Sequence, residues 1–327
     1  IIVPYEMYRR YGDARILSEN YEMMKKWYAF LETRAKKSPM NPVKRLKRNP
    51  YRRYTIETGV DYGEWCEPDV ESTSAMRTPQ GKVATAFFAH SGQMMAEIAE
   101  ILENEEDAAH YKKTAELAKK AWRFIATEDG KIHSDRQADY VRALAFELLE
   151  GEEAKQAAAD LNELVKKCDY HLNTGFLSTP NLTRVLCDYG YEDTAYKLLL
   201  QDTRPSWLYE VKKGATTIWE TWDGINEKGE VKASLNHYSY GAICGWIVDS
   251  VCGIRVEDNR VTIKPHPDKA LGFAKAAYHS PYGRIGCGWK YDGDKVIYEV
   301  EIPSNVKAEV ILQDGRSEML EAGSYSL

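Results

Sequence analysis

Two neighbouring stretches carry residues that could do acid–base chemistry on an uncharged, hydroxyl-rich molecule. Glu220 stands between Trp219 and Trp222, and the pair Asn236 and His237 follows shortly after. A glutamate can act as a general base or a nucleophile. The flat apolar face and single N–H donor of tryptophan suit the C–H face of a sugar ring. The alternative is that both tryptophans are core residues, that Glu220 caps or pairs with a neighbour, and that His237 is bonded to the backbone in the core.

A second acidic and aromatic stretch lies near residue 65. Residues 59–69 contain two glycines, a proline, Trp65 and four carboxylates, among them Glu64. This composition predicts a loop, and loops on a rigid scaffold commonly carry function. The stretch is therefore a second candidate for substrate contact. The alternative is a polar turn that buries Trp65 in the core.

The bulk composition excludes several kinds of partner. The 327 residues have a formal net charge of -6 and a pI of about 5.8, which argues against nucleic acid or an anionic membrane as the main partner. A basic run over residues 34–53 is interpreted as a solvated loop, with phosphate or RNA binding as the alternative. Aromatic residues reach 11%. This value is compatible with a small carbohydrate as the partner, and the oligomeric state is left open.

The cysteines and the apolar runs bear on location and on metals. No pair of the six cysteines has C-x-x-C spacing, and no H-E-x-x-H motif is present, so we expect neither a metal site nor a cofactor. Scattered free thiols favour a reducing compartment, and a cytoplasmic location is the resulting prediction. No run is long and apolar enough to span a membrane. Because the chain opens at Ile1 without Met, we expect the natural N-terminus to lie upstream.

The elements that would position these residues are mostly helices. A turn-and-helix pattern begins at residue 4, and a helix is predicted to open at Thr78-Pro79. Around residues 104, 151 and 190 an apolar helix ends at Gly or Asn and acids begin the next one. The unit is an αα-hairpin, repeated irregularly every 40 to 50 residues or so. This pattern predicts a closed toroid whose polar loops form the rim of a binding cup.

The last quarter of the chain changes character. A final helix is expected over residues 237–252, ending at Gly253. Alternating segments then run over residues 260–264, 286–291, 296–302 and 307–312, with a turn signal at Asp292-Gly293. The predicted domains are therefore a helical catalytic domain at 1–253 and a small β-sandwich at 254–327.

In this order, the motifs resemble those of bacterial α-L-rhamnosidases, glycoside hydrolase family 78. The specific pair is G-A-T-T-I-W-E-T-W-D-G over residues 214–224 with S-L-N-H-Y after it. Weaker matches lie at residues 11–13, 62–65, 174–177, 205–207 and 253–254. The resemblance spans nearly the whole chain. It implies a mainly α fold, an (α/α)6 barrel of the six-hairpin toroid type that lacks its first helices here, followed by a β-sandwich.

The resemblance also implies residue roles. Glu220 matches the general base that activates water in an inverting hydrolysis, and His237 matches the histidine that contacts the sugar near that base. Trp65 matches an aromatic that packs against the rhamnose ring. Trp219 and Trp222 would shape the surroundings of the base, and Asn236 and Glu64 join them as expected substrate-binding residues. The family usually has Asp before this tryptophan, where this chain has Glu64.

One part of the family's site has no match. The general acid of the family lies upstream of everything in this chain, so we expect residues 1–327 to lack it. Asp61, Glu64, Glu67 and Asp135 are the candidates for a substitute. The rival hypotheses are another (α/α)-toroid glycosidase on neutral sugars, a catalytically inactive carbohydrate-binding protein, and a helical-repeat scaffold for protein partners.

Overall fold

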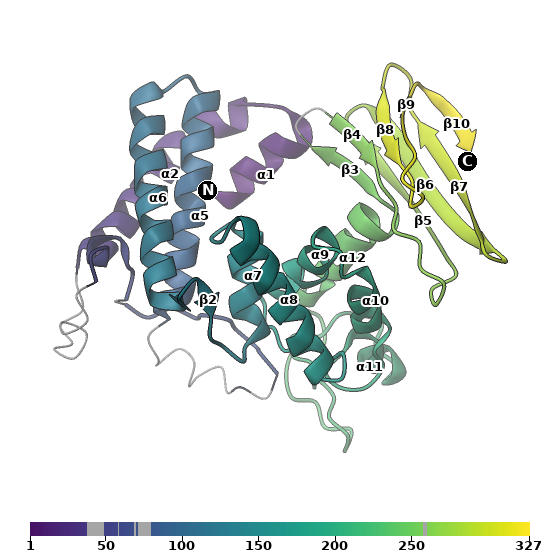
Figure 1. Ribbon diagram of the computed structural model, residues 1–327, viewed down its shortest axis with the longest axis horizontal. Helices are drawn as coiled ribbons and strands as arrows, with labels where there is room; N and C mark the ends of the chain where they lie inside the picture. The colour runs from purple at the N-terminus through teal and green to yellow at the C-terminus, as the bar shows by residue number, and fades with distance from the viewer. Residues whose placement is uncertain (38–48, 58, 69, 71–79, 258–259) are drawn as a thin grey trace.

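Helices form most of the first three quarters of the chain. The computed structural model describes residues 1–37, 49–57, 59–68, 70, 80–257 and 260–327 (Figure 1). The helical elements in chain order are α1 (Ile2–Tyr11), α2 (Arg15–Lys36), η1 (Arg52–Tyr54), α5 (Gly81–Ile101), α6 (Glu105–Ala126), α7 (Gln137–Ala145), α8 (Gly151–Lys167), α9 (Thr179–Asp188), α10 (Glu192–Leu200), α11 (Trp207–Lys212), η2 (Ser239–Ala242), α12 (Ile243–Trp246) and the π-helical turn η3 (Ile247–Val251).

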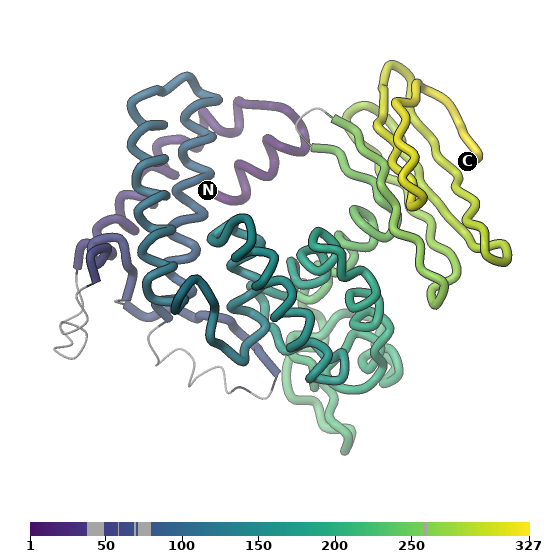
Figure 2. Tube along the Cα trace, viewed as in Figure 1, coloured from purple at the N-terminus to yellow at the C-terminus, as the bar shows by residue number. Residues whose placement is uncertain are grey.

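The repeated hairpins of the sequence are present as pairs of adjacent helices. α5 pairs with α6, α7 with α8, and α9 with α10, and the second helix of each pair has acids in its first turn. Those carboxylates lie at the positive end of the helix dipole. Gly190, before α10, takes the left-handed conformation with φ of 83°, which is unstrained for glycine. The hairpins follow one another around a curve (Figure 2). The predicted mainly α toroid of hairpins is confirmed.

Some sequence expectations differ in detail or lie outside the described residues. The break between α1 and α2 falls at Gly12, as expected. The predicted helix start at Thr78-Pro79 and residues 38–48 of the basic run are not among the described residues. The expected helix over residues 237–252 is instead a succession of 3₁₀, α and π turns that begins at Ser239. It starts late because the backbone of His237 is bonded to Ile218 in the preceding loop.

The C-terminal part is a sandwich of two four-stranded sheets. One sheet has the order β10-β7-β6-β5 and the other β3-β4-β8-β9. The strands are β3 (Ile254–Glu257), β4 (Arg260–Ile263), β5 (Phe273–Ser280), β6 (Gly283–Asp292), β7 (Lys295–Ile302), β8 (Ala308–Ile311), β9 (Ser317–Leu320) and β10 (Gly323–Ser326). The turn at Asp292-Gly293 joins β6 to β7 as predicted. The sequence analysis missed β5. Its side chains alternate between half-buried and exposed, so the strand has no fully buried apolar face to reveal it.

Contacts join the sandwich to the helices. The indole N–H of Trp289 on β6 donates to the carbonyl oxygen of Val251 at 2.7 Å, and Arg9 on α1 pairs with Glu257 on β3 at 2.7 Å. In sequence, the helical part ends at Val251 and the first strand of the sandwich begins at Ile254. The domain boundary at residues 253 and 254 stays a prediction.

A short hairpin, β1 (Thr127–Glu128) with β2 (Lys131–Ile132), lies between α6 and α7. No described helix is long and apolar enough to cross a membrane.

Candidate active site

The two stretches that carry Glu220 and His237 lie side by side. They belong to an irregular loop, residues 214–238, between α11 and η2, which we call the base loop. The backbone N–H of Glu220 donates to the carbonyl oxygen of Ser234 at 2.9 Å, and that of His237 donates to Ile218 at 2.8 Å. These two bonds fold the base loop back on itself. They bring together the two residues that the sequence motifs singled out.

The Glu220 carboxylate is only lightly engaged. The side chain is half-buried, and its Oε2 accepts a bond of 3.3 Å from the backbone N–H of Ser234. Within the part of the chain that the structure describes, no lysine or arginine forms an ion pair with it. A half-exposed carboxylate with spare lone pairs can accept a proton from a bound water.

Both tryptophans that flank Glu220 are buried. Trp219 is 1% exposed and Trp222 is 2% exposed. The Trp222 ring stacks on Tyr240 with centroids 3.9 Å apart and meets Trp207 edge-on at 5.5 Å. The Trp222 indole thus belongs to a buried cluster of aromatic rings with Trp207 and Tyr240. Their predicted contact with a sugar stays a prediction, and this burial does not favour it.

His237 lies in a small stack of rings. It stacks on Phe176, with 4.9 Å between ring centroids, and on Tyr238 at 5.2 Å. The backbone N–H of Ser239 lies 3.3 Å from Nδ1, which therefore accepts, so in the neutral imidazole the proton is on Nε2. An Nε2–H group can donate to a substrate hydroxyl. Asn236 is exposed at the turn, where its backbone bonds to the hydroxyl of Ser234.

Trp65 borders a large, mostly apolar cavity of about 830 Å³. Its half-buried ring meets Tyr62 edge-on at 5.1 Å, and its carbonyl oxygen accepts a bond of 2.8 Å from the backbone N–H of Phe176. Phe176 also lines the cavity, so it lies between Trp65 and His237. A Cβ at Gly175 would approach the Trp65 carbonyl oxygen to 2.1 Å, so only glycine permits this contact.

Glu64 points into the protein. It is 2% exposed, and one carboxylate oxygen accepts the backbone N–H groups of Gly175, at 3.0 Å, and Ser178, at 2.8 Å. The other accepts the Ser178 hydroxyl at 2.9 Å and pairs with Arg142 on α7, which also donates to Asp139 at 2.9 Å. Glu64 therefore links the Trp65 loop to the turn that carries Phe176. Its predicted substrate contact stays a prediction that this bonding pattern does not favour.

The other candidate acids are mostly paired. Asp61 forms a two-pronged ion pair with Arg34, with oxygen–nitrogen distances of 3.1 and 3.0 Å. Both oxygens of Glu67 accept hydrogen bonds from the Arg136 guanidinium, one from Nε and one from Nη2, although burial still raises the pKa of this carboxyl. Asp135 is exposed.

Sequence reasoning missed three residues that support the site. Phe176 stood in a stretch that had been singled out, but its ring carried no charge or motif that marked it. Arg142 and Glu210 sit inside helical patterns, and nothing local distinguishes them from surface charges. Glu210 on α11 is 1% exposed, and it accepts the backbone N–H of Trp219 at 3.1 Å. Burial raises the pKa of this carboxyl to about 7.

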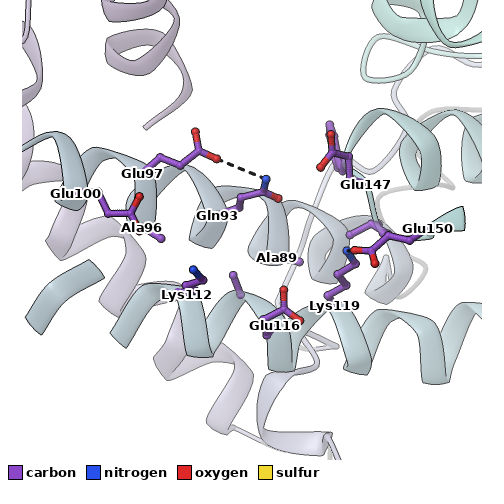
Figure 3. Close-up of a pocket in the computed structure, with 13 residues that line it drawn as sticks. Ala89, Gln93, Ala96, Glu97, Glu100, Lys112, Glu116, Lys119, Glu147 and Glu150 are labelled. Atoms are coloured by element: carbon purple, nitrogen blue, oxygen red, sulfur yellow. Dashed lines mark hydrogen bonds and ion pairs between the residues drawn. The ribbon is translucent and has the colours of Figure 1, made fainter. Parts of the chain in front are cut away.

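A second cleft, of about 260 Å³, lies between α5, α6 and the turn before α8 (Figure 3). Its polar lining residues are Gln93, Glu97, Glu100, Lys112, Glu116, Lys119, Glu147 and Glu150. None of the residues singled out in the sequence lines it. Among the described residues, no group of three or more His, Cys, Asp or Glu side chains is placed to hold a metal ion.

Repeated helical hairpins followed by a C-terminal β-sandwich are the architecture of a six-hairpin glycosidase. The family model for the bacterial alpha-L-rhamnosidase 6 hairpin glycosidase domain matches residues 1–251, and that for the bacterial alpha-L-rhamnosidase C-terminal domain matches residues 259–325. The chain belongs to the bacterial α-L-rhamnosidase family.

Individual relatives agree with this assignment. An alpha-L-rhamnosidase of Formosa agariphila is 35% identical over 332 residues, which cover 98% of this chain and 34% of the relative. An alpha-L-rhamnosidase of Streptomyces avermitilis is 33% identical over 319 residues, which cover 95% of this chain and 28% of the relative. The chain thus spans about a third of the length of these curated relatives.

Solved structures give the same result. The Streptomyces avermitilis alpha-L-rhamnosidase complexed with L-rhamnose has a TM-score of 0.83 at 32% identity and covers 99% of this chain and 32% of its own. The native alpha-L-rhamnosidase of Aspergillus terreus has a TM-score of 0.85 at 27% identity. This match covers 99% of this chain and 38% of the solved chain.

Proposed function

We propose that this chain carries the base-bearing part of an inverting α-L-rhamnosidase site that releases terminal α-L-rhamnose. The observation that carries the proposal is the environment of the Glu220 carboxylate. Its carboxylate is half-buried, lightly bonded and free of described ion pairs, beside His237 on a folded loop. The relatives named alpha-L-rhamnosidase, one of them solved with L-rhamnose, support the choice of sugar.

In the proposed mechanism, Glu220 takes a proton from a water molecule. The oxygen of that water bonds to the anomeric carbon while the bond from this carbon to the leaving oxygen breaks on the opposite face. A general acid protonates the departing oxygen. Inversion needs the two carboxyl groups roughly 6.5–9.5 Å apart to leave room for the water. His237 would donate to a sugar hydroxyl, and Trp65 would pack against the sugar ring.

We further propose that the general acid is supplied from outside residues 1–327. Asp61 and Glu67 are each held by an arginine, and Glu64 has its oxygens engaged by backbone N–H groups, a hydroxyl and Arg142. Asp135 is exposed. None of these four has the arrangement expected of a neutral acid aimed at a leaving group.

A substrate with an activated leaving group tests whether Glu220 supplies the base while the general acid comes from outside residues 1–327. A 2,4-dinitrophenyl α-L-rhamnoside loses its phenolate without protonation, so the base half of the site suffices to hydrolyse it. We expect turnover by this chain, and Glu220→Gln should lower kcat by about 10²- to 10⁴-fold. Glu230→Gln, at an exposed residue of the same loop, is the matched control and should leave kcat unchanged.

Binding provides a second arm of the test. Calorimetry should detect L-rhamnose but neither D-glucose nor L-fucose, and Trp65→Ala should weaken the affinity. Binding of L-rhamnose without any turnover of the activated substrate would favour a catalytically inactive carbohydrate-binding protein. Binding of D-glucose instead would favour another toroid glycosidase. Equal turnover by the wild type and Glu220→Gln would overturn the assignment of the base.

A further inference from the structure

Glu210 is a buried carboxyl that the proposed mechanism does not use. It lies on α11, which supports the base loop at several points. The hydroxyl of Tyr209 donates to the carbonyl oxygen of Ile225 at 3.2 Å, and the indole N–H of Trp207 donates to Tyr240 at 3.0 Å. The Glu210 carboxyl makes the contact next to the base itself, because its Oε2 accepts the N–H of Trp219, the residue before Glu220.

The other oxygen of this carboxyl is buried without a partner. Glu210 is 1% exposed, and Oε1 makes no hydrogen bond within the described structure. An ionised carboxylate in this position would hold a buried negative charge with no protein donor for one of its oxygens, which is strongly unfavourable. A neutral carboxyl tolerates the site far better, and it still accepts the Trp219 N–H.

Few charged groups could offset such a charge. Lys213, directly after α11, lies over the Tyr209 ring, and Lys212 on α11 pairs with Asp202 from the segment after α10. The base loop contributes Glu220 and His237, and η2 contributes the Tyr240 phenol, which donates to the carbonyl oxygen of Cys66. Among the described residues, none of these side chains bonds to the Glu210 carboxyl.

We propose that Glu210 is a positioning residue for Glu220: the neutral carboxyl holds the Trp219 turn in place, and its ionisation opens that turn to water. Opening would hydrate the bare oxygen and so relieve the cost of the buried charge. Glu220 would then lose its fixed position. This inference rests on the proposed function only for its effect on catalysis, because the opening itself needs no substrate. Burial raises the pKa of the Glu210 carboxyl to about 7, so the change falls near neutral pH.

Backbone amide NMR of the ¹⁵N-labelled chain tests the structural step directly. The Trp219 amide, assigned with Trp219→Phe, is expected to shift between pH 5.5 and 8.5 with a midpoint near 7. In Glu210→Gln, a permanently neutral isostere that keeps the acceptor oxygen, the shift should disappear. It should persist in His237→Gln, which removes the neighbouring imidazole as another source of the shift. Glu230→Gln is the control for a charge change elsewhere in the loop.

Hydrogen exchange of the Glu220 amide reports whether the turn opens. At pH 8 we expect exchange about tenfold faster in the wild type than in Glu210→Gln, and equal rates at pH 5.5. A merely structural role for Glu210 would change the rate equally at both pH values. If Glu210→Gln does not fold, the wild-type chain and His237→Gln still decide, since the absence of a Trp219 titration in both would overturn the proposal.

The catalytic consequence is measured separately. With the activated rhamnoside, Glu210→Gln should retain kcat above pH 7, where the wild type declines. A Trp219 titration and faster Glu220 exchange without any hydrolysis would support the positioning role and contradict the proposed function. Hydrolysis whose decline above pH 7 is the same in the wild type and Glu210→Gln would overturn the positioning role and leave the proposed function intact.

Discussion

Phe176 stacks on His237 with 4.9 Å between their ring centroids, while its backbone N–H donates to the carbonyl oxygen of Trp65 at 2.8 Å. One residue thus connects the loop that carries the predicted sugar platform to the loop that carries the predicted base. The connection is made by a side chain on one side and by the backbone on the other. The two halves of the candidate site are therefore in contact through this one residue.

Phe176→Leu should weaken L-rhamnose binding without unfolding the chain. Leucine keeps most of the apolar volume but loses the ring stack, which is worth about 0.5–1.5 kcal/mol, or roughly 2- to 13-fold in affinity. Calorimetry with L-rhamnose measures the change. Phe124→Leu, at an exposed position on α6, serves as the control. An affinity equal to that of the control would show that the stack does not position His237.

Glu64→Gln should destabilise the fold strongly. The change leaves Arg142 buried without its ionic partner in this loop, and breaking a buried pair in this way costs about 3–5 kcal/mol. Urea unfolding measures the loss. Glu301→Gln removes an exposed pair with Arg284 on the sandwich and should cost no more than about 1 kcal/mol.

The double variant Glu64→Gln/Arg142→Met completes this comparison. Removing both charges should recover part of the stability that Glu64→Gln loses, because no guanidinium then remains buried against residue 64, while Asp139 keeps the Ser134 hydroxyl at 2.8 Å and Lys82 at 3.7 Å. A Glu64→Gln chain as stable as Glu301→Gln would refute the linking role. It would also restore substrate contact as the leading role for this carboxylate.

His90 should make the helical domain sensitive to acid. Its ring stacks flat on Phe146 at 4.1 Å, and burial lowers the pKa of the imidazole to about 4. The unfolded chain binds this proton near pH 6.5, whereas the folded chain binds it only near 4. Stability from this group is therefore present above pH 6.5 and is lost as the pH falls toward 4.

His90→Phe keeps the stack and removes the titration. Between pH 7 and 4, its unfolding free energy should gain about 2–3 kcal/mol relative to the wild type, as followed by urea unfolding. His279→Gln, on the exposed side of β5, is the control for loss of an imidazole. A constant difference between His90→Phe and the wild type across this range would contradict the prediction.

The sequence predicted the parts of this structure that depend on local pattern. Apolar spacing and acids after Gly or Asn identified the hairpins, and the motif singled out two stretches, around Glu220 and His237, that hydrogen bonds join in the structure. β5 escaped because its strand lacks a buried face of large apolar residues. Arg142 and Glu210 escaped because the burial of a charge is decided by distant segments. The partners of Glu64, for example, come from α7 and from the turn at residues 175–178.

Glu64 also illustrates why a motif and a role differ. An acid beside a tryptophan in a stretch with two glycines and a proline has the composition of a substrate-binding loop. In the structure the tryptophan borders the cavity, and the acid turns inward to organise the neighbouring loop. Adjacent side chains of an irregular loop need not face the same way, and sequence alone does not distinguish them.

Chemical rescue of Glu220→Ala tests the assignment of the base most directly. Azide needs no proton removed, so it can attack the anomeric carbon from the space that the carboxylate leaves, while dinitrophenolate departs. With 2,4-dinitrophenyl α-L-rhamnoside, we predict that Glu220→Ala loses about 10²- to 10⁴-fold in turnover. Azide should restore turnover and yield the rhamnosyl azide of inverted, β configuration, identified by ¹H NMR. Unchanged turnover in Glu220→Ala without azide, or a rescued product of retained configuration, would contradict the role of Glu220 as the base.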